Sequence, residues 1–172
     1  MDTNLFENKH IIVIDRDGKT VLKKNKLGQV AVLPYRINPD DSWDILVRIE
    51  PMPARNFRKE YVALTGSMDE GEDPVETALR ELYEEAGYTA GRDKIKPLGD
   101  IYESKKFEDP LHAFAVDVTG LNAVEPPGDG SKLETQSSAA WITEVVRDKM
   151  CMQIKDGVFL SMVAKFVCLK LI

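Results

Sequence analysis

The amino-acid sequence predicts an α+β domain, in which short antiparallel strands are combined with two or three helices. Runs of β-favouring residues come in closely spaced pairs with turn residues between them. Residues 73–87 instead repeat their apolar side chains at helical spacing, and residues 158–169 form a largely apolar segment of helical length. No internal repeat or shift in composition divides the chain, so we expect a single domain that spans residues 1–172.

Turn residues and prolines set the limits of the expected strands. The Asp-Gly pair at 17–18 is a turn signal between two short apolar runs and predicts a small N-terminal hairpin. The polar cluster at 38–41 ends one strand and begins its partner. Pro51 and Pro53 disfavour regular pairing, so residues 50–58 are expected to form a loop. In chain order, the expected strands are residues 11–14, 20–22, 29–37, 43–49, 60–64, 95–102, 112–118 and 139–143.

The helix expected at residues 73–87 has signals at both ends. Asp73 can cap its first turn, Pro74 suits the first helical position, and Glu76 completes the spacing of a capping box. Gly87 suits the end of the helix. The apolar residues that share one arc, which must face the core, are Val75, Leu79, Leu82 and Ala86.

Three carboxylates share a second arc of this helix, because residues three and four positions apart are neighbours on a helix surface. We call Glu81, Glu84 and Glu85 the acidic ridge. They repel one another by roughly a few tenths of a kcal/mol per pair, and Arg80 is the only basic residue of the helix that offsets them. Most acidic helix faces are solvated surface. Hard oxygen ligands at this density also suit Mg²⁺ or Mn²⁺, so the helix alone leaves both interpretations open.

The segment that leads into the helix favours the metal site. From residue 66 to residue 88 the chain matches every fixed position of the signature G-x5-E-x7-R-E-U-x-E-E-x-G-U, where U is a bulky apolar residue. The chain therefore resembles the Nudix hydrolases, with an aromatic residue at the last position, where an aliphatic one is more usual. The fixed positions are Gly66, Glu72, Arg80, Glu81, Leu82, Glu84, Glu85, Gly87 and Tyr88.

This resemblance implies a fold, a reaction and a set of site residues. Nudix hydrolases share an α/β/α sandwich around a mixed sheet, and here an N-terminal β-hairpin precedes it. The implied reaction is attack of water on one phosphorus of a diphosphate, assisted by Mg²⁺ or Mn²⁺. Arg80 and Glu72 would pair and brace the loop against the helix, since an arginine fork fixes a carboxylate, and Gly66 and Gly87 would bound the box. The implied metal ligands are Glu81, Glu84, Glu85 and the carbonyl of Thr65.

Residues outside the box resemble the ADP-ribose and nucleotide-sugar pyrophosphatases. Arg48 matches a substrate-binding arginine of that branch, and Glu108 falls where the branch has a functional glutamate. Glu134, in the long polar loop ahead of the last expected strand, resembles a mobile-loop glutamate that acts as the general base. The strands of residues 1–28 are similar to those with which these enzymes dimerise, so a homodimer is expected. Glu103 departs from the pattern, because the branch typically has a proline there.

Composition and charge exclude other classes of function. A net charge of −6 argues against non-specific binding of nucleic acid, whereas a bound divalent cation would still allow an anionic substrate. Lys165 and Lys170 interrupt the longest apolar stretch, so no membrane span is expected. The N-terminus has no signal-like segment and the chain has 2 cysteines, so a reducing cytoplasm is the expected compartment.

Several functions remain open at this point. The first is hydrolysis of ADP-ribose or a nucleotide sugar, and the second is cleavage of dinucleoside polyphosphates or nucleoside triphosphates. The third is a non-catalytic module that senses a nucleotide; such modules usually lose box carboxylates, which are complete here. An isoprenoid isomerase of this type uses a cysteine upstream of the box, and both cysteines here lie downstream.

Some candidate side chains also have a structural interpretation. Arg48 and Arg58 suit an exposed surface as well as a site, and Glu134 suits a solvated loop. The side chains that we expect to be strand, core or buried thiol residues are His112, Trp141, Phe159, Cys151 and Cys168.

Overall fold

A mixed sheet forms the centre of the molecule. The computed structural model describes residues 2–24, 28–128, 130 and 136–169. The strands of this sheet follow the order β10-β5-β4-β9-β8, with β6 paired to β5 and β7 paired to β4. Strands β4 and β9 are parallel, and the other described pairs are antiparallel. The strands are β4 (Gln29–Ile37), β5 (Trp43–Met52), β6 (Arg58–Val62), β7 (Leu64–Ser67), β8 (Ile95–Ile101), β9 (Leu111–Asp117) and β10 (Ser138–Ile142).

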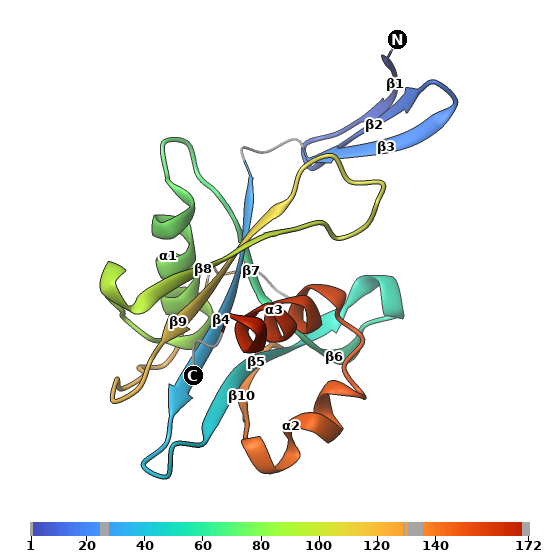
Figure 1. Ribbon diagram of the computed structural model, residues 1–172. Helices are drawn as coiled ribbons and strands as arrows, with labels where there is room; N and C mark the ends of the chain where they lie inside the picture. The colour runs from blue at the N-terminus through green and yellow to red at the C-terminus, as the bar shows by residue number, and fades with distance from the viewer. Residues whose placement is uncertain (1, 25–27, 129, 131–135, 170–172) are drawn as a thin grey trace.

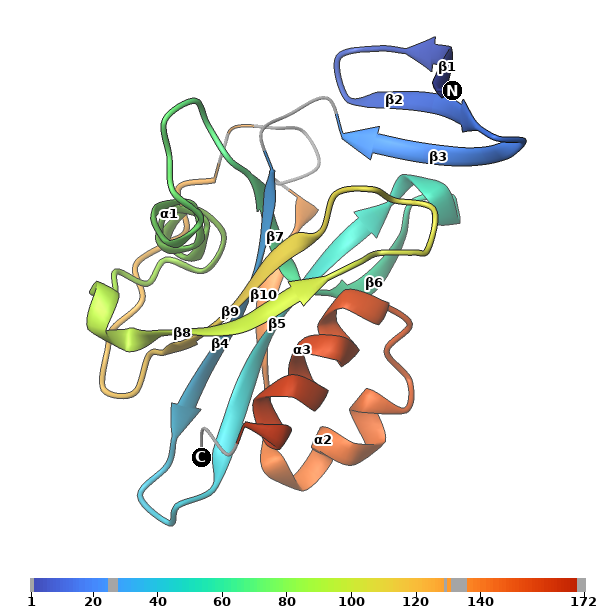
Figure 2. The ribbon, with the colours of Figure 1, turned by 45° about the horizontal axis from the view of Figure 1, so that its top comes forward.

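Helices cover both faces of this sheet, as Figures 1 and 2 show. Helix α1 (Pro74–Ala86) packs on one face and α3 (Gly157–Cys168) on the other. Neighbouring residues of β4 alternate between the two cores, with Val30 and Val32 on the α1 side and Leu33 on the α3 side. A strand that is buried on both faces needs a continuous apolar run, which β4 provides. The structure therefore confirms the predicted α/β/α sandwich.

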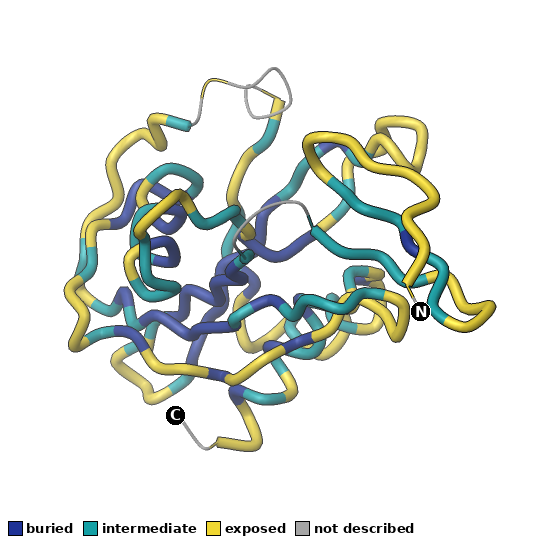
Figure 3. Tube along the Cα trace, turned by 90° about the horizontal axis from the view of Figure 1, so that it is seen from above, coloured by how far each residue is buried: buried dark blue, intermediate teal, exposed yellow. Residues whose placement is uncertain are grey.

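A second, three-stranded antiparallel sheet precedes the central one. Its strands are β1 (Asp2–Glu7), β2 (Ile11–Arg16) and β3 (Lys19–Lys24), in the order β1-β2-β3. The predicted hairpin corresponds to β2 and β3. Strand β1 is an addition that the sequence pattern did not reveal, because its two large apolar residues are adjacent rather than alternating. Figure 3 shows that this sheet is mostly exposed or half-buried, whereas buried positions gather in the central sheet and in α1.

The prediction of a loop at residues 50–58 is wrong in part. Strand β5 continues past Ile49, and Pro51 lies opposite Lys59 of β6. The described pairing between β10 and β5 ends at Ile49. Beyond that point β6 is the described neighbour of β5, and a proline is tolerated on such an edge. The chain then turns through the short helix η1 (Pro53–Arg55).

Other elements also differ from the predicted set. The strand expected at 60–64 is divided into β6, which pairs with β5, and β7, which pairs with β4. Besides η1, the described part of the chain has two further helices that the sequence did not predict, the short η2 (Arg92–Lys94) and α2 (Glu144–Cys151). Helix α2 has only 8 residues and none of them is fully buried, so its apolar pattern is too short to detect. Among the described residues, every helix is too short or too polar to cross a bilayer.

Candidate functional site

Helix α1 begins and ends where its sequence signals predict. The Asp73 carboxylate accepts hydrogen bonds from the N–H groups of Val75 and Glu76, at 2.8 and 3.0 Å. The Glu76 carboxylate accepts one in return from the Asp73 N–H at 3.4 Å, which completes the capping box. Gly87 ends the helix with a φ of 73°, a left-handed conformation that glycine adopts without strain. The helix that carries the acidic ridge is therefore fixed at both ends.

Glu72 and Arg80 tie the loop ahead of α1 to the helix. Nε and Nη2 of Arg80 donate to the two carboxylate oxygens of Glu72, at 2.9 and 3.0 Å. Nη2 also donates to the Ser67 carbonyl at 3.0 Å, and the Thr77 hydroxyl donates to Glu72 at 2.9 Å. The hydrogen bonds from Arg80 lower the pKa of Glu72 to about 2. This carboxylate is therefore ionised throughout the physiological pH range.

The acidic ridge is sheltered rather than exposed. Nη1 of Arg80 donates to Glu81 at 2.8 Å and to Glu84 at 2.9 Å, so these two carboxylates lie side by side. The side chains of Glu81 and Glu85 are only 11% and 10% exposed, and that of Glu84 is 26% exposed. Carboxylates this sheltered require charged or hydrogen-bonding partners. The interpretation of the ridge as an ordinary solvated face is therefore wrong.

Gly66 makes room for the carboxylate of Glu81. A Cβ atom at position 66 would come within 1.8 Å of both Cδ and Oε1 of Glu81. Gly66 does not have a positive φ, so this close approach, and not the backbone conformation, requires glycine. Thr65 immediately precedes it on β7. The peptide that joins Thr65 to Gly66 therefore lies beside the acidic ridge.

Arg48 reaches the ridge from strand β5. Its Nε lies 3.3 Å from Glu85 Oε1 and 3.2 Å from Glu50 Oε2, and its Nη1 donates to the Glu85 carbonyl at 3.5 Å. Arg48 is 4% exposed, whereas Arg58 is an exposed residue. The surface interpretation is therefore wrong for Arg48 and correct for Arg58. The buried guanidinium is therefore held among carboxylates at the acidic ridge.

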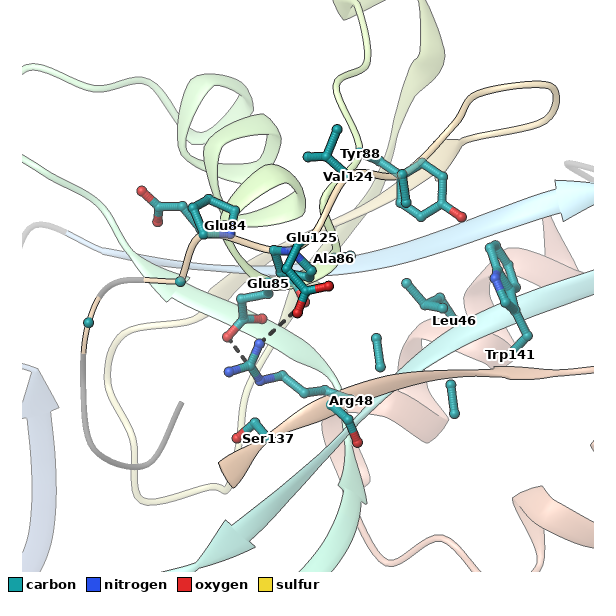
Figure 4. A pocket seen from close by; sticks show the side chains of 18 residues that line it. Leu46, Arg48, Glu84, Glu85, Ala86, Tyr88, Val124, Glu125, Ser137 and Trp141 are labelled. Atoms are coloured by element: carbon teal, nitrogen blue, oxygen red, sulfur yellow. Dashed lines mark hydrogen bonds and ion pairs between the residues drawn. The ribbon is translucent and has the colours of Figure 1, made fainter. Parts of the chain in front are cut away.

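A cavity of about 530 Å³ opens beside the C-terminal end of α1. Figure 4 shows Arg48 pointing toward Glu85 at one end of it, with Leu46, Tyr88 and Trp141 toward the other end. One end is therefore charged and the other apolar. The remaining lining residues are Glu84, Ala86, Ala123, Val124, Glu125, Pro126, Pro127, Gly128, Gly130, Ser137, Ser138, Ala139 and Ala140.

Backbone hydrogen bonds hold part of the long polar loop against α1 and so form a wall of this cavity. The Val124 N–H donates to the Gly87 carbonyl, and the Gly128 N–H donates to the Glu84 carbonyl, both at 3.0 Å. A Cβ atom at position 87 would come within 2.0 Å of the Val124 carbonyl oxygen. Gly87 is therefore required both for its positive φ and for the approach of this loop.

The family of the chain follows from comparison with known domains. The model of the NUDIX domain matches residues 11–145, which is most of the chain. The chain belongs to the Nudix family. Residues 66–88 are accordingly its Nudix box, and the capped helix, the Glu72–Arg80 brace and the sheltered ridge are the structure of that box.

Individual relatives match shorter stretches. The chain is 39% identical over 88 residues to the ADP-ribose pyrophosphatase of Bacillus subtilis (strain 168). This aligned stretch covers 51% of this chain and 44% of the relative. It is 37% identical over 59 residues to the putative 8-oxo-dGTP diphosphatase of the same organism, covering 34% and 38%. The chain thus spans less than half the length of the curated relatives it matches. A solved structure described as an ADP compounds hydrolase has a TM-score of 0.67 over 99% of this chain and 93% of its own, at 16% identity, and shows that the fold is shared.

The donor set of the Nudix box fits a hard divalent cation. In the part of the chain that the structure describes, no group of three or more His, Cys, Asp or Glu side chains is arranged to hold a metal ion. The ridge carboxylates are instead engaged by the guanidinium groups of Arg80 and Arg48. The donors are oxygen atoms only, which suits Mg²⁺ or Mn²⁺. Because Gly66 has no side chain, the Glu81 carboxylate lies close to the backbone between Thr65 and Gly66. The Thr65 carbonyl would therefore be near enough to serve as a further oxygen ligand.

One of the residues expected from the resemblance, Glu108, lies elsewhere. The Glu108 carboxylate pairs with Arg16 at 2.9 Å and Lys23 at 3.2 Å, and its N–H donates to the Leu22 carbonyl at 2.9 Å. It therefore fastens the N-terminal sheet to the β8–β9 loop and does not line the cavity beside α1; its role in substrate binding stays a prediction. Glu134 lies outside the described residues.

Trp141 and Glu50 are site residues that the sequence did not identify. Trp141 was expected in the core, but it is only half-buried, lines the cavity, and has the Arg36 guanidinium stacked 4.2 Å from its ring centre. Tyr88, at the end of the Nudix box, meets it edge-on. Glu50 could have been found from strand alternation, since residues two apart point to the same face and it follows Arg48 by two positions.

The remaining side chains for which we expected a structural role are His112, Phe159, Cys151 and Cys168. His112 is a hydrogen-bonded strand residue, with Nδ1 2.9 Å from Asp100 Oδ1. Phe159 is fully buried in the core. Cys151 is half-buried, and burial raises the pKa of its thiol. Cys168 is exposed, so the expectation that it is a buried thiol is wrong.

Proposed function

We propose that this chain hydrolyses the diphosphate linkage of a nucleoside diphosphate derivative with Mg²⁺ or Mn²⁺, and that ADP-ribose or a nucleotide sugar is its substrate. The observation that carries this proposal is a complete Nudix box, of whose sheltered ridge Glu84 and Glu85 line a cavity of about 530 Å³ together with buried Arg48. A cavity of this volume suits a ligand of nucleotide size. The 39% identity to an ADP-ribose pyrophosphatase supports the choice of substrate.

Each part of the site has a proposed role in the reaction. The acidic ridge and the Thr65 carbonyl would hold the cation, which supplies Lewis acidity and neutralises charge on the diphosphate when it is bound. Arg48 would bind a phosphate oxygen through its N–H fork. Glu134 would accept a proton from the attacking water as general base. The water oxygen bonds to one phosphorus while the bridging P–O bond breaks, and the electron pair leaves with the other phosphate.

A panel of diphosphate compounds, assayed with Mg²⁺ and with Mn²⁺ and with products identified by mass, tests this proposal. We expect AMP and ribose 5-phosphate from ADP-ribose, with little turnover of nucleoside triphosphates. EDTA should abolish the reaction. Absence of turnover across the panel, or full turnover in EDTA, would contradict the proposal.

A second candidate is cleavage of a nucleoside triphosphate or a dinucleoside polyphosphate. The 37% identity to a putative 8-oxo-dGTP diphosphatase favours it. The same panel distinguishes the two, because this activity would release pyrophosphate from a triphosphate faster than AMP from ADP-ribose. A nucleotide-sensing module would bind members of the panel and hydrolyse none of them.

We also propose that residues 1–172 act as one domain that forms a homodimer through its N-terminal sheet. All residues of β1 are exposed, including Leu5 at 58% and Phe6 at 53%, and β1 is an edge strand of the described sheet. Such an edge can pair with a second copy. Light scattering at micromolar concentration should give twice the 19.3 kDa chain mass, and Phe6→Asp should shift it toward that of the single chain. A reducing cytoplasm is the compartment we propose, consistent with two free cysteines.

A further inference from the structure

Arg48 and a bound cation would compete for the same carboxylate. Arg48 is 4% exposed, and a charge buried to this extent needs an ionised partner. One of its partners is Glu85, 3.3 Å away, whose side chain is itself 10% exposed. The proposed function, on which this inference rests, assigns Glu85 to the divalent cation. A cation bound to this carboxylate weakens its hold on the guanidinium, because two positive groups then share one negative charge.

We propose that Arg48 neutralises Glu85 in the metal-free protein, and that cation binding releases its guanidinium to the diphosphate of the substrate. The charge balance of the site supports this exchange. Five carboxylates, from Glu50, Glu72 and the acidic ridge, face two guanidinium groups, from Arg80 and Arg48. Three negative charges remain, and a divalent cation balances two of them. The displaced Arg48 then supplies a positive charge for the arriving phosphates.

The contacts of Arg48 allow it to change partner without leaving the site. Glu50 follows it by two positions on β5, so both side chains lie on the same face of the strand. Glu50 lies 3.2 Å from Arg48 Nε and would keep the guanidinium at the cavity wall after Glu85 is lost. Guanidinium has five N–H donors in a planar fork, which matches phosphate oxygens.

Arg80, unlike Arg48, would keep its position if a cation took the ridge carboxylates. It donates to both oxygens of Glu72 and to the Ser67 carbonyl, and none of these groups is assigned to the metal. Loss of its contacts to the ridge would therefore leave it braced in place. Arg80 is the fixed guanidinium of the site, and Arg48 is the exchangeable one.

Binding of Mn²⁺ alone to the full-length chain, followed by the electron paramagnetic resonance signal of the free ion, tests this exchange. Arg48→Gln removes the competitor and should lower the Kd for Mn²⁺ about tenfold, equivalent to about 1.4 kcal/mol. Arg48→Met, which keeps the bulk of the side chain, should do the same. Arg48→Lys keeps a competing cation and should stay within about threefold of the wild type.

Arg92→Gln is the matched control for charge. Arg92 pairs with Asp73 and Glu76 at the other end of α1, at 2.6 and 2.9 Å, and is exposed. The variant removes one positive charge from η2, beside the N-terminal end of α1, without touching Glu85, so its Kd for Mn²⁺ should change by less than about twofold. An effect as large as that of Arg48→Gln would assign the tightening to net charge and overturn the exchange.

A second measurement follows the released guanidinium. In the wild type, Mn²⁺ should tighten binding of the α,β-methylene analogue of ADP, and in Arg48→Gln this gain should shrink about tenfold, although the metal itself binds more tightly. If Arg48→Gln and Arg48→Met both have native circular dichroism but bind Mn²⁺ no more tightly than the wild type, this inference is overturned and the proposed function is not. Absence of Mn²⁺ binding in the wild type would overturn the proposed function together with it.

Discussion

Replacing Gly66 with alanine tests the position of the acidic ridge by adding one carbon atom. Gly66 does not have a positive φ, so alanine suits its backbone. The added Cβ would lie 1.8 Å from the Glu81 carboxylate, whereas real Cβ contacts are essentially never shorter than 3.0 Å. Glu81 must therefore move by about 1.2 Å, the difference between these two distances.

This displacement should reduce turnover more than stability. Overpacking typically costs about 1–3 kcal/mol. The Glu81 side chain can rotate, so we expect a loss of about 1 kcal/mol, which lowers the Tm of a chain of this size by roughly 2–4 °C. Misplacement of a catalytic group by about 1 Å can cost on the order of 100-fold in rate. Gly66→Ala should therefore lower kcat on ADP-ribose by roughly that factor.

A double-mutant cycle separates this contact from a general defect. Turnover with Mg²⁺ and thermal unfolding by circular dichroism are measured for Gly66→Ala, Glu81→Ala and the double variant. Glu81→Ala removes the atoms that the new Cβ would meet, so adding Gly66→Ala to it should cause little further loss of either quantity. Wild-type turnover in Gly66→Ala, or fully additive losses, would refute the reasoning.

Four further variants, at three positions, test the other parts of the box. Glu85→Gln removes a proposed metal ligand, so kcat should fall by roughly two orders of magnitude or more with native circular dichroism; near-normal turnover would contradict the assignment. Glu72→Gln removes the carboxylate whose pKa Arg80 lowers from 4.5 to about 2. A lowered pKa stabilises the fold above about pH 4.5, and this contribution is lost as the pH falls through 2. The variant's free energy of unfolding should therefore lie below that of the wild type at pH 7 and converge with it near pH 2; parallel curves would count against the brace. Gly87→Ala and Gly87→Asn should both raise KM, because asparagine relieves the positive φ but not the contact with Val124; a normal KM in Gly87→Asn would show that φ alone matters.

Helix α1 could be predicted from the sequence to within a residue because its signals are local. The groups that cap it belong to Asp73 and Glu76, which lie within its own first turn, and Gly87 ends it through its own φ. The spacing of the acidic ridge is likewise a property of one helix. The most accurate part of the prediction is therefore the part in which cause and effect are close in sequence.

The burial of Arg48 could not be predicted, because it depends on a distant partner. Arg48 and Glu85 are 37 residues apart, and they meet only because β5 lies in the sheet that α1 covers. The sequence places Arg48 in an expected strand and Arg58 in an expected loop, but a strand position alone does not decide whether an arginine is buried. The strand position of Pro51 also depends on distant residues. Pro51 is tolerated in β5 because the described pairing with β10 ends at Ile49 and β6 is the described neighbour beyond it.

The cavity was outside the reach of pattern reasoning for a similar reason. Its charged end comes from α1 and β5, and Trp141 joins it from β10. An aromatic residue in a short strand looks like a core residue, and only the docking of the polar loop at Val124 and Gly128 encloses the space beside it. Enclosure of this kind is a property of several elements together.

The most direct test of the central claim is a crystal structure of the full-length chain soaked in Mn²⁺, with the metal located by its anomalous scattering. We expect a peak bound by oxygen atoms of the acidic ridge and by the Thr65 carbonyl, with Arg48 turned away from Glu85. A ridge that keeps its two guanidinium partners, with no manganese beside it at millimolar concentration, would contradict the account.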